Sequence, residues 1–344
     1  MLELKTGIVY DKIFLEHDQQ GHPENANRLK AIIDGLEGKK LFEKVELLNS
    51  RIADEEEISL CHSIDYIHQI KEFCEKGGGY FDPDTYSNTH SFKAAATAVG
   101  GSIELVKAVL ENRLKNGFAL LRPPGHHALS NRAMGFCLFG NIAIAAKFAL
   151  RHPVVNKVAI VDFDVHHGNG TQALINDDPN ILFISSHQYP FYPGTGSIHE
   201  TGKSDAEGTI INIPLQVGAG DDGFKLFYEK IVIPSIERFN PDLILVSAGY
   251  DAHWEDPLAN LNLSLAGYNW ISKKLIETAK KICNDKIVFF LEGGYNLNVL
   301  SYGVANSISR LLGIDYFEDP IGKSTQAEPD VEKEINELLK IHNL

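Results

Sequence analysis

The sequence predicts an α/β fold in which eight strands form one mostly parallel sheet, with helices covering both faces. Short runs of apolar residues recur along the chain, and such runs are typical of strands buried on both faces of a parallel sheet. A helical segment or a long loop separates each run from the next, which is the alternation that βα units produce. The chain has 344 residues, of which 44% are hydrophobic, so it can bury one large core. We therefore expect residues 1–344 to form a single domain.

The predicted strands are apolar runs too short to be helices, each followed by polar or turn-forming residues. In chain order they lie at Thr6–Tyr10, Val45–Leu48, Phe118–Leu121, Val158–Val161, Ile181–Ser186, Thr209–Ile213, Leu243–Ala248 and Ile287–Leu291.

The predicted helices carry apolar residues three or four positions apart, as Leu29, Ile32 and Leu36 do. In the first half of the chain they lie at Glu24–Leu36, Asp54–Cys61, Ile64–Cys74, Ser91–Leu114 and Asn141–Leu150. Three glycines open an expected loop at Tyr80–Asn88. The C-terminal tail, residues 322–344, is expected to be peripheral, and its first part, as far as Glu332, to be loosely held.

The charge balance narrows the classes of partner. The chain has 32 basic and 46 acidic residues, a net charge of -14, which argues against a general affinity for nucleic acid or anionic lipid. A basic substrate, such as a lysine-rich tail or a polyamine, would be attracted to a protein with this negative charge. The four cysteines are not closely paired and do not form a disulfide framework. The N-terminus has no apolar segment of signal-peptide length, and no run approaches the ~20 residues that span a bilayer. We expect a cytoplasmic protein without a membrane partner.

The segment KVAIVDFDVHHGNG, from Lys157 to Gly170, carries the strongest chemical signal. Its apolar run ends abruptly in two carboxylates and two imidazoles, which are costly to remove from water unless they pair or bind a metal ion. Asp164 and His166 are two residues apart, so on an extended segment they point the same way, as two ligands of one ion would. Asp162 has the same parity and is placed to orient a neighbouring ligand.

Reactive residues also follow other predicted strands. In a parallel sheet the ligand site lies beyond the carboxyl ends of the strands, so these residues are expected to meet there. The segments in question are His126-His127 after Phe118–Leu121, His187 after Ile181–Ser186, Gly249-Tyr250-Asp251 after Leu243–Ala248, and Glu292-Gly293-Gly294-Tyr295 after Ile287–Leu291.

Asp164, His166 and Asp251 make a set of two carboxylates and one imidazole. Three protein ligands with a position left for water are typical of a catalytic zinc site, whereas a structural site is closed. The metal would activate a water and polarise a carbonyl. His126 and His127 suit the role of base, and the Tyr295 hydroxyl suits that of oxyanion donor.

These residues stand in five motifs, namely RPPGHHA, DFDVHHGNGTQ, FYPGTG, AGYDAHWEDPL and LEGGYN. Together they resemble the zinc-dependent histone deacetylases of the class II type and the bacterial acetylpolyamine and acetoin-utilisation amidohydrolases. The resemblance covers about residues 6–313. It implies an arginase-deacetylase-like domain that hydrolyses an N-acetyl amide to an amine and acetate, with one catalytic zinc ion per chain and iron(II) as the alternative.

The resemblance also implies roles for single residues. Asp164, His166 and Asp251 correspond to the metal ligands, and Asp162 to the partner of the first histidine of the tandem pair. Asn169 stands where the classical nuclear enzymes have a carboxylate to pair with the second histidine. The further positions implied are the substrate-channel residues Phe136, Tyr192, Leu258, Gly293 and Gly294, with Asp82 or Asp84 for the substrate amide, Arg28 at an acetate exit, and a structural potassium site at Asp162, Asp164, His166 and Ser185.

Several functions fit this pattern. The first is removal of acetyl or longer acyl groups from lysine in proteins or peptides, and the second is deacetylation of small molecules such as acetylpolyamines. A catalytically silent metal-binding sensor or scaffold is a third, and a binuclear manganese ureohydrolase of the same fold a fourth. The apolar Leu258, where polyamine-selective members of the family carry an acidic residue, favours the first. The sequence leaves the oligomeric state open, and a homo-oligomer is compatible with it.

Overall fold

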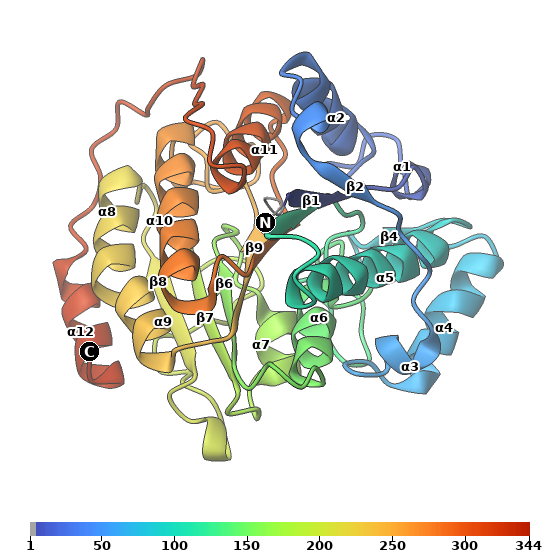
Figure 1. Cartoon of the computed structure of the whole chain (residues 1–344), viewed down its shortest axis with the longest axis horizontal. Coiled ribbons are helices and arrows are strands. Elements are labelled where there is room, and N and C mark those ends of the chain that lie inside the picture. Colours follow the sequence, from blue (N-terminus) through green and yellow to red (C-terminus); the bar gives the residue numbers. More distant parts are fainter. Residues whose placement is uncertain (1–4) are drawn as a thin grey trace.

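The computed structural model describes residues 5–344 and is built around one eight-stranded sheet. The strands are β1 (Thr6–Val9), β2 (Glu46–Leu48), β5 (Asn116–Ala119), β6 (Val158–Asp162), β7 (Ile181–Gln188), β8 (Ile210–Leu215), β9 (Leu243–Ala248) and β10 (Ile287–Leu291). Their order across the sheet is β2-β1-β5-β10-β9-β6-β7-β8, and every neighbouring pair is parallel. The eight-stranded α/β fold is therefore confirmed (Figure 1).

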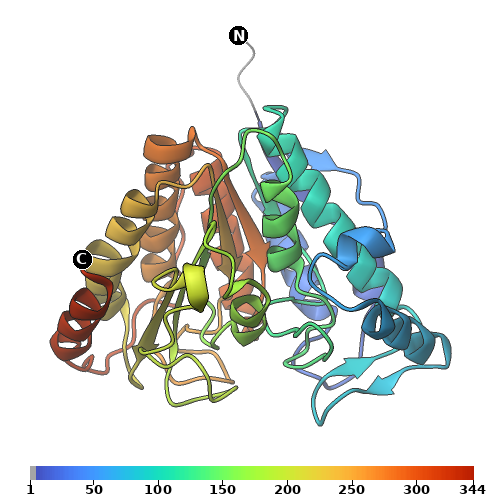
Figure 2. The ribbon, with the colours of Figure 1, turned by 90° about the horizontal axis from the view of Figure 1, so that it is seen from below.

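Helices cover both faces of this sheet (Figures 1 and 2). On one face α5 (Ser91–Leu110) and α6 (Asn141–Leu150) pack together, and α7 (Asn169–Ile175) lies beside α6. On the other face α2 (Asn27–Gly38), α11 (Leu297–Leu311) and α10 (Leu265–Cys283) pack in sequence, with α8 (Asp221–Phe227) and α9 (Ile233–Phe239) beside α10. The shorter helices are α1 (Ile13–Glu16), α3 (Glu55–Ile58) and α4 (Ile64–Glu75).

The core fills both interfaces between the sheet and the helices. Every residue of β6, β9 and β10 is buried. This burial on both faces explains why these strands are apolar runs and do not alternate with polar residues. All four cysteines are buried free thiols, as the lack of close pairing predicted. Among the described residues, no helix combines the length and apolar character that crossing a bilayer requires.

The sheet topology positions the site. Because the strands are parallel, their carboxyl ends lie along a single edge. The four strands β5, β10, β9 and β6 are immediate neighbours in that order. They are also the strands that precede the PPGHH, EGGY, GYD and DFDVHH segments. Residues scattered between His126 and Tyr295 in the sequence are therefore brought to one place.

Several boundaries differ from the sequence-based expectation. Strand β5 ends at Ala119, two residues early, and β7 continues to Gln188, so His187 lies within the strand and does not follow it. Helix α5 ends at Leu110 because the chain turns at Asn112, which adopts a left-handed conformation with a φ of 54°. Two short strands, β3 (Gly79–Tyr80) and β4 (Tyr86–Ser87), form a hairpin where only a loop was expected.

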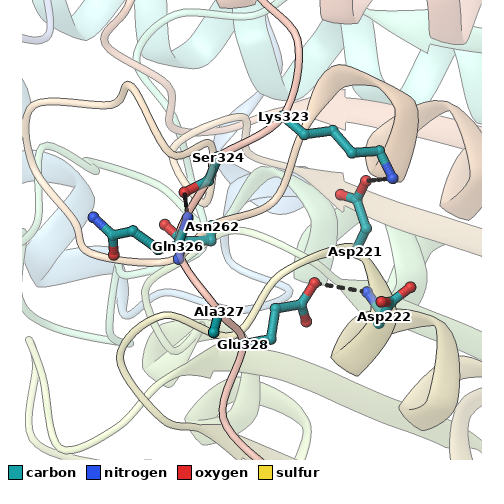
Figure 3. A pocket seen from close by; sticks show the side chains of 8 residues that line it. All are labelled: Asp221, Asp222, Asn262, Lys323, Ser324, Gln326, Ala327 and Glu328. Atoms are coloured by element: carbon teal, nitrogen blue, oxygen red, sulfur yellow. Dashed lines mark hydrogen bonds and ion pairs between the residues drawn. The ribbon is translucent and has the colours of Figure 1, made fainter.

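The C-terminal tail is more firmly attached than the sequence suggested. The Glu328 carboxylate accepts hydrogen bonds from the backbone N–H groups of Gly220, Asp222 and Gly223, at 2.9, 3.0 and 2.9 Å. Lys323 pairs with Asp221 at 2.8 Å, and Figure 3 shows this ion pair together with the bond between Glu328 and Asp222. The chain then forms α12 (Glu332–His342), which contacts the edge strand β8. The expectation of a loosely held tail was wrong because one tail carboxylate satisfies the free N–H groups at the start of α8.

Replacing Glu328 with alanine should lower the free energy of unfolding by about 1–3 kcal/mol, because backbone N–H groups at a helix start lose their acceptor. Chemical denaturation measures this change. The matched control is Glu332→Ala, which removes an exposed carboxylate of the tail. Its free energy of unfolding should stay within about 0.5 kcal/mol of the parent value. Equal stability of the two variants would contradict the docking of the tail through Glu328.

Candidate functional site

Asp164, His166 and Asp251 meet at the carboxyl edge of the sheet, where their ligand atoms all lie within 4.8 Å of one another. His166 Nδ1 is 3.2 Å from an Asp164 oxygen and 3.3 Å from Asp251 Oδ2. Both carboxylates are fully buried, and the His166 side chain is 12% exposed. The three residues that the sequence singled out as a ligand set therefore come together.

The surrounding backbone orients these carboxylates. Val165 N–H donates to Asp251 Oδ1 at 2.9 Å, and Gly293 N–H donates to Asp164 Oδ2 at 2.8 Å. Asp251 Oδ2 accepts no hydrogen bond, although it is buried. A Cβ atom at Gly293 would clash with both carboxylates, so glycine is required for the chain to approach them.

The three side chains bring two buried carboxylates against one imidazole. Burial, followed by the charge of Asp164, raises the pKa of Asp251. Burial alone would lower the pKa of His166, but its contacts with Asp164 and Asp251 outweigh burial and raise the pKa to about 10. Asp164 and Asp251 are buried, and Asp251 Oδ2 accepts no hydrogen bond, so this pair of carboxylates needs positive charge beside it. Two carboxylates and one imidazole are also a ligand set that divalent metal ions accept.

The tandem histidines lie beside this triad, with ring centroids 4.0 Å apart. His126 Nδ1 is 3.0 Å from Asp162 Oδ2, and His127 Nδ1 is 2.7 Å from Asn169 Oδ1. Burial alone would lower the pKa of His126, but nearby carboxylates, Asp164 first, raise it well above the usual value. Burial, reinforced by the charge of His126, lowers the pKa of His127 well below the usual value. The two adjacent histidines therefore favour different protonation states.

Two buried carboxylates that the sequence reasoning did not assign also border the site. Glu292 accepts from the N–H groups of Gly125 and His126, at 2.7 and 3.2 Å, and so connects the end of β10 to the loop after β5. Asp256 accepts from the N–H groups of Leu258 and Tyr295, at 3.0 and 2.7 Å. Burial raises the pKa of each to about 7. Both residues stand inside the sequence motifs, but the partners of Glu292, and Tyr295 as a partner of Asp256, lie far away in sequence.

A cavity of about 450 Å³ leads to the triad. It is lined by His22, Pro23, Tyr80, Pro83, Asp84, Gly135, Phe136, His166, Phe191, Tyr192, Leu258 and Tyr295. Phe136, Tyr192 and Leu258 are thus in the cavity, whereas Gly293 and Gly294 are not among its lining residues. His22, Tyr80 and Phe191 were missed. Phe191 stacks on the His166 ring, with centroids 5.5 Å apart, and adjoins Tyr192 in the FYPGTG motif, which was the available signal.

The two acidic residues of the hairpin loop occupy different positions. Asp82 Oδ1 accepts from the backbone N–H groups of Asp84 and Thr85, at 3.2 and 2.6 Å, so it stabilises its own turn. Asp84 lines the cavity. Burial, followed by the hydrogen bond with Asp82, raises the pKa of Asp84. The geometry therefore places Asp84, and not Asp82, on the cavity wall.

Other residues implied by the resemblance surround the centre. Arg28 is fully buried, donates to the Gly294 carbonyl at 2.7 Å, and lies 5.1 Å from the centre of the Tyr295 ring. Burial raises the pKa of Tyr295 well above its usual value, so the phenol keeps its proton. Ser185 pairs in register with Asp162 across β6 and β7, and its hydroxyl is 2.9 Å from His187 Nδ1.

Comparison with known proteins agrees with these motifs. The histone deacetylase domain family matches residues 22–311. Histone deacetylase 14, chloroplastic, from Arabidopsis thaliana is 43% identical over 318 residues, which are 88% of this chain and 75% of that protein. A probable deacetylase from Archaeoglobus fulgidus is 38% identical, over 90% of this chain and 87% of the relative. The crystal structure of the HDA15 HD domain superposes with a TM-score of 0.90 and 35% identity, covering 99% of this chain and 95% of that one.

The triad should hold one divalent ion per chain, and Asp251→Ala and His166→Ala should each lose most of the bound metal, because each removes one of only three protein ligands. Elemental analysis of the purified protein measures the stoichiometry. Asp82→Asn, which removes an acidic charge outside the triad, serves as the control and should keep its metal. Full metal content in both triad variants would refute the assignment.

Proposed function

The chain belongs to the histone deacetylase family, and from this premise we propose that it is a zinc-dependent amidohydrolase that removes acetyl groups from the ε-amine of lysine in proteins or peptides. The reaction class is hydrolysis of a linear amide C–N bond with release of acetate. The observation that carries the proposal is the buried Asp164–His166–Asp251 triad, which lies beside two histidines at the end of an aromatic cavity. We also propose that the described residues act as one domain.

Zinc is the proposed ion because one nitrogen and two oxygen ligands leave room for water and substrate, with iron(II) as the alternative. When bound there, the ion would supply a Lewis acid that activates water and polarises the amide carbonyl. Among residues 5–344, Asp164, His166 and Asp251 are the single cluster of this kind, which disfavours a binuclear ureohydrolase.

The two histidines have different proposed parts. His127 has a lowered pKa and is neutral near pH 7, and its Nδ1 hydrogen is held by Asn169, so Nε2 is available to accept a proton from water. His126 pairs with the Asp162 carboxylate and carries the positive charge of the pair. Asn169 is uncharged, so it orients His127 without raising its basicity as a carboxylate would.

Tyr295 is the proposed oxyanion donor, since its hydroxyl remains protonated and its side chain lines the cavity beside His166. Phe136 and Tyr192 are the proposed walls for the lysine chain, because flat apolar faces exclude water along its aliphatic stem. Gly293 and Gly294 are proposed to lie at the inner end of this channel. Asp84 is the proposed partner of the substrate's backbone amide.

Arg28 and Ser185 complete the proposal. Arg28, buried behind Gly294, is the residue proposed to receive the departing acetate. Ser185, with the carbonyls near Asp162, Asp164 and His166, is proposed to hold a structural potassium ion. The compartment and the oligomeric state stay predictions, and two of the relatives are named as chloroplastic proteins.

Tyr295→Phe should lower kcat by roughly 10²-fold or more, because it removes one oxyanion donor, while the metal content is unchanged. Turnover of an acetyl-lysine peptide measures this effect. His127→Ala should be at least as damaging. The matched control is Tyr302→Phe on α11, whose ring packs against Lys39 and should do so without its hydroxyl. Near-normal turnover by Tyr295→Phe would rule out the proposed mechanism, and full inactivity of the parent on all acyl-lysines would favour a silent metal-binding sensor.

Leu258→Glu should shift the ratio of kcat/KM values toward acetylspermidine and away from an acetyl-lysine peptide by roughly tenfold or more. A carboxylate at the cavity rim adds a charged hydrogen bond of about 1–3 kcal/mol to a remote ammonium, and about 1.4 kcal/mol is a factor of ten. Val217→Glu adds the same charge at a position that is 63% exposed and outside the cavity lining, which controls for the overall charge of -14. A parent enzyme that prefers acetylspermidine would support deacetylation of small molecules instead.

A further inference from the structure

We propose that Asp256 is a positioning residue that holds the Tyr295 loop and the Leu258 loop together, and thereby fixes the Tyr295 hydroxyl relative to the rim of the cavity. The inference rests on the proposed function, because it takes Tyr295 as the oxyanion donor. Asp256 lies in the loop after β9, between Asp251 and Leu258, and its side chain is only 6% exposed. It belongs to neither the metal triad nor the cavity lining.

The contacts of this carboxylate are all with backbone N–H groups. Oδ1 accepts from Leu258 at 3.0 Å, whereas Oδ2 accepts from Tyr295 at 2.7 Å and from Asn296 at 3.3 Å. No lysine, arginine or histidine of the described residues forms an ion pair with it. A buried carboxylate without a cationic partner depends on its hydrogen bonds, so these three bonds hold it in one orientation.

The bonds join two loops that are distant in sequence. Leu258 follows β9, and Tyr295 follows β10, so one carboxylate spans the carboxyl ends of two neighbouring strands. Leu258 and Tyr295 both line the cavity, so this clamp joins two parts of the cavity wall. A shift of Asp256 would therefore move the rim and the phenol together.

The Tyr295 backbone is held on both sides of the residue. Arg28 binds the carbonyl of Gly294, which has a φ of 115° that favours glycine, and Asp256 binds the N–H groups of Tyr295 and Asn296. The Asn296 side chain then accepts from Asn298 and Val299 and caps α11. Between these anchors the backbone that carries the Tyr295 side chain has little freedom. Catalytic groups lose efficiency with displacements near 1 Å, so loss of the Asp256 anchor should weaken the contribution of Tyr295.

A double-mutant cycle tests this coupling in the metal-loaded enzyme. Asp256→Asn places an NH₂ group against a backbone N–H, and it should lower kcat by roughly 10- to 100-fold, with a smaller change in KM. In the Tyr295→Phe background the same substitution should lower kcat by less than about threefold, because the hydroxyl that it displaces is already absent. Glu255→Gln is the matched control, since Glu255 is the neighbouring carboxylate and is exposed. Equal losses in both backgrounds would overturn the proposal, because a general structural defect acts independently of Tyr295.

Amide hydrogen exchange supplies a readout that does not depend on activity. In the parent protein the amides of Tyr295 and Leu258 should exchange more slowly than that of the exposed Leu297, and Asp256→Asn should speed the exchange of both protected amides. Rapid exchange of the two amides in the parent would overturn the clamp even if the variant did not fold. If the parent failed to deacetylate any substrate while both amides were protected, the proposed function would fail and the clamp would stand.

Discussion

Buried negative charge at one edge of the sheet is the constraint on which the rest of the structure depends. Asp162, Asp164, Asp251 and Glu292 are almost completely buried there, with His126 and His127 among them. Carboxylates in such a place must be neutralised, paired or bound to a cation, because removal from water penalises the charged form. The parallel sheet makes this arrangement tolerable, since the loops after its strands present backbone N–H groups to the same region.

The backbone accordingly orients most of the buried carboxylate oxygens. Gly293 donates to Asp164, Val165 donates to Asp251, and the loop of His126 donates to Glu292. These bonds leave Asp251 Oδ2 without a donor, beside His166 and Asp164. The position of the proposed metal ion is thus defined by what the backbone bonds leave unsatisfied. The cavity above it carries several aromatic side chains, which suit the aliphatic stem of a lysine side chain.

Backbone bonds also explain why residues outside the reacting set matter to its geometry. Arg28, Asp256 and Asn296 each hold part of the segment from Gly294 to the start of α11, and Glu292 holds the loop of the tandem histidines. The C-terminal tail is held in the same way at α8, where the Glu328 carboxylate accepts hydrogen bonds from three backbone N–H groups. In each case a side chain satisfies backbone groups that the end of a strand or helix leaves free.

The sequence by itself determined the fold class and the eight strands, and it supplied the candidate residues of the triad, because each of these depends on local patterns at a strand or its end. A buried strand has to be an apolar run, and charged residues directly after it have to be exposed, paired or bound to a metal ion. Only the tertiary structure decided which strands are neighbours, and hence that the segments after β5, β10, β9 and β6 meet. It also separated Asp84 on the cavity wall from Asp82 in its turn, and revealed the partners of Glu292, Asp256 and Glu328. These hydrogen bonds join segments up to 167 residues apart. No local pattern in the sequence specifies from which distant N–H group a carboxylate will accept a hydrogen bond.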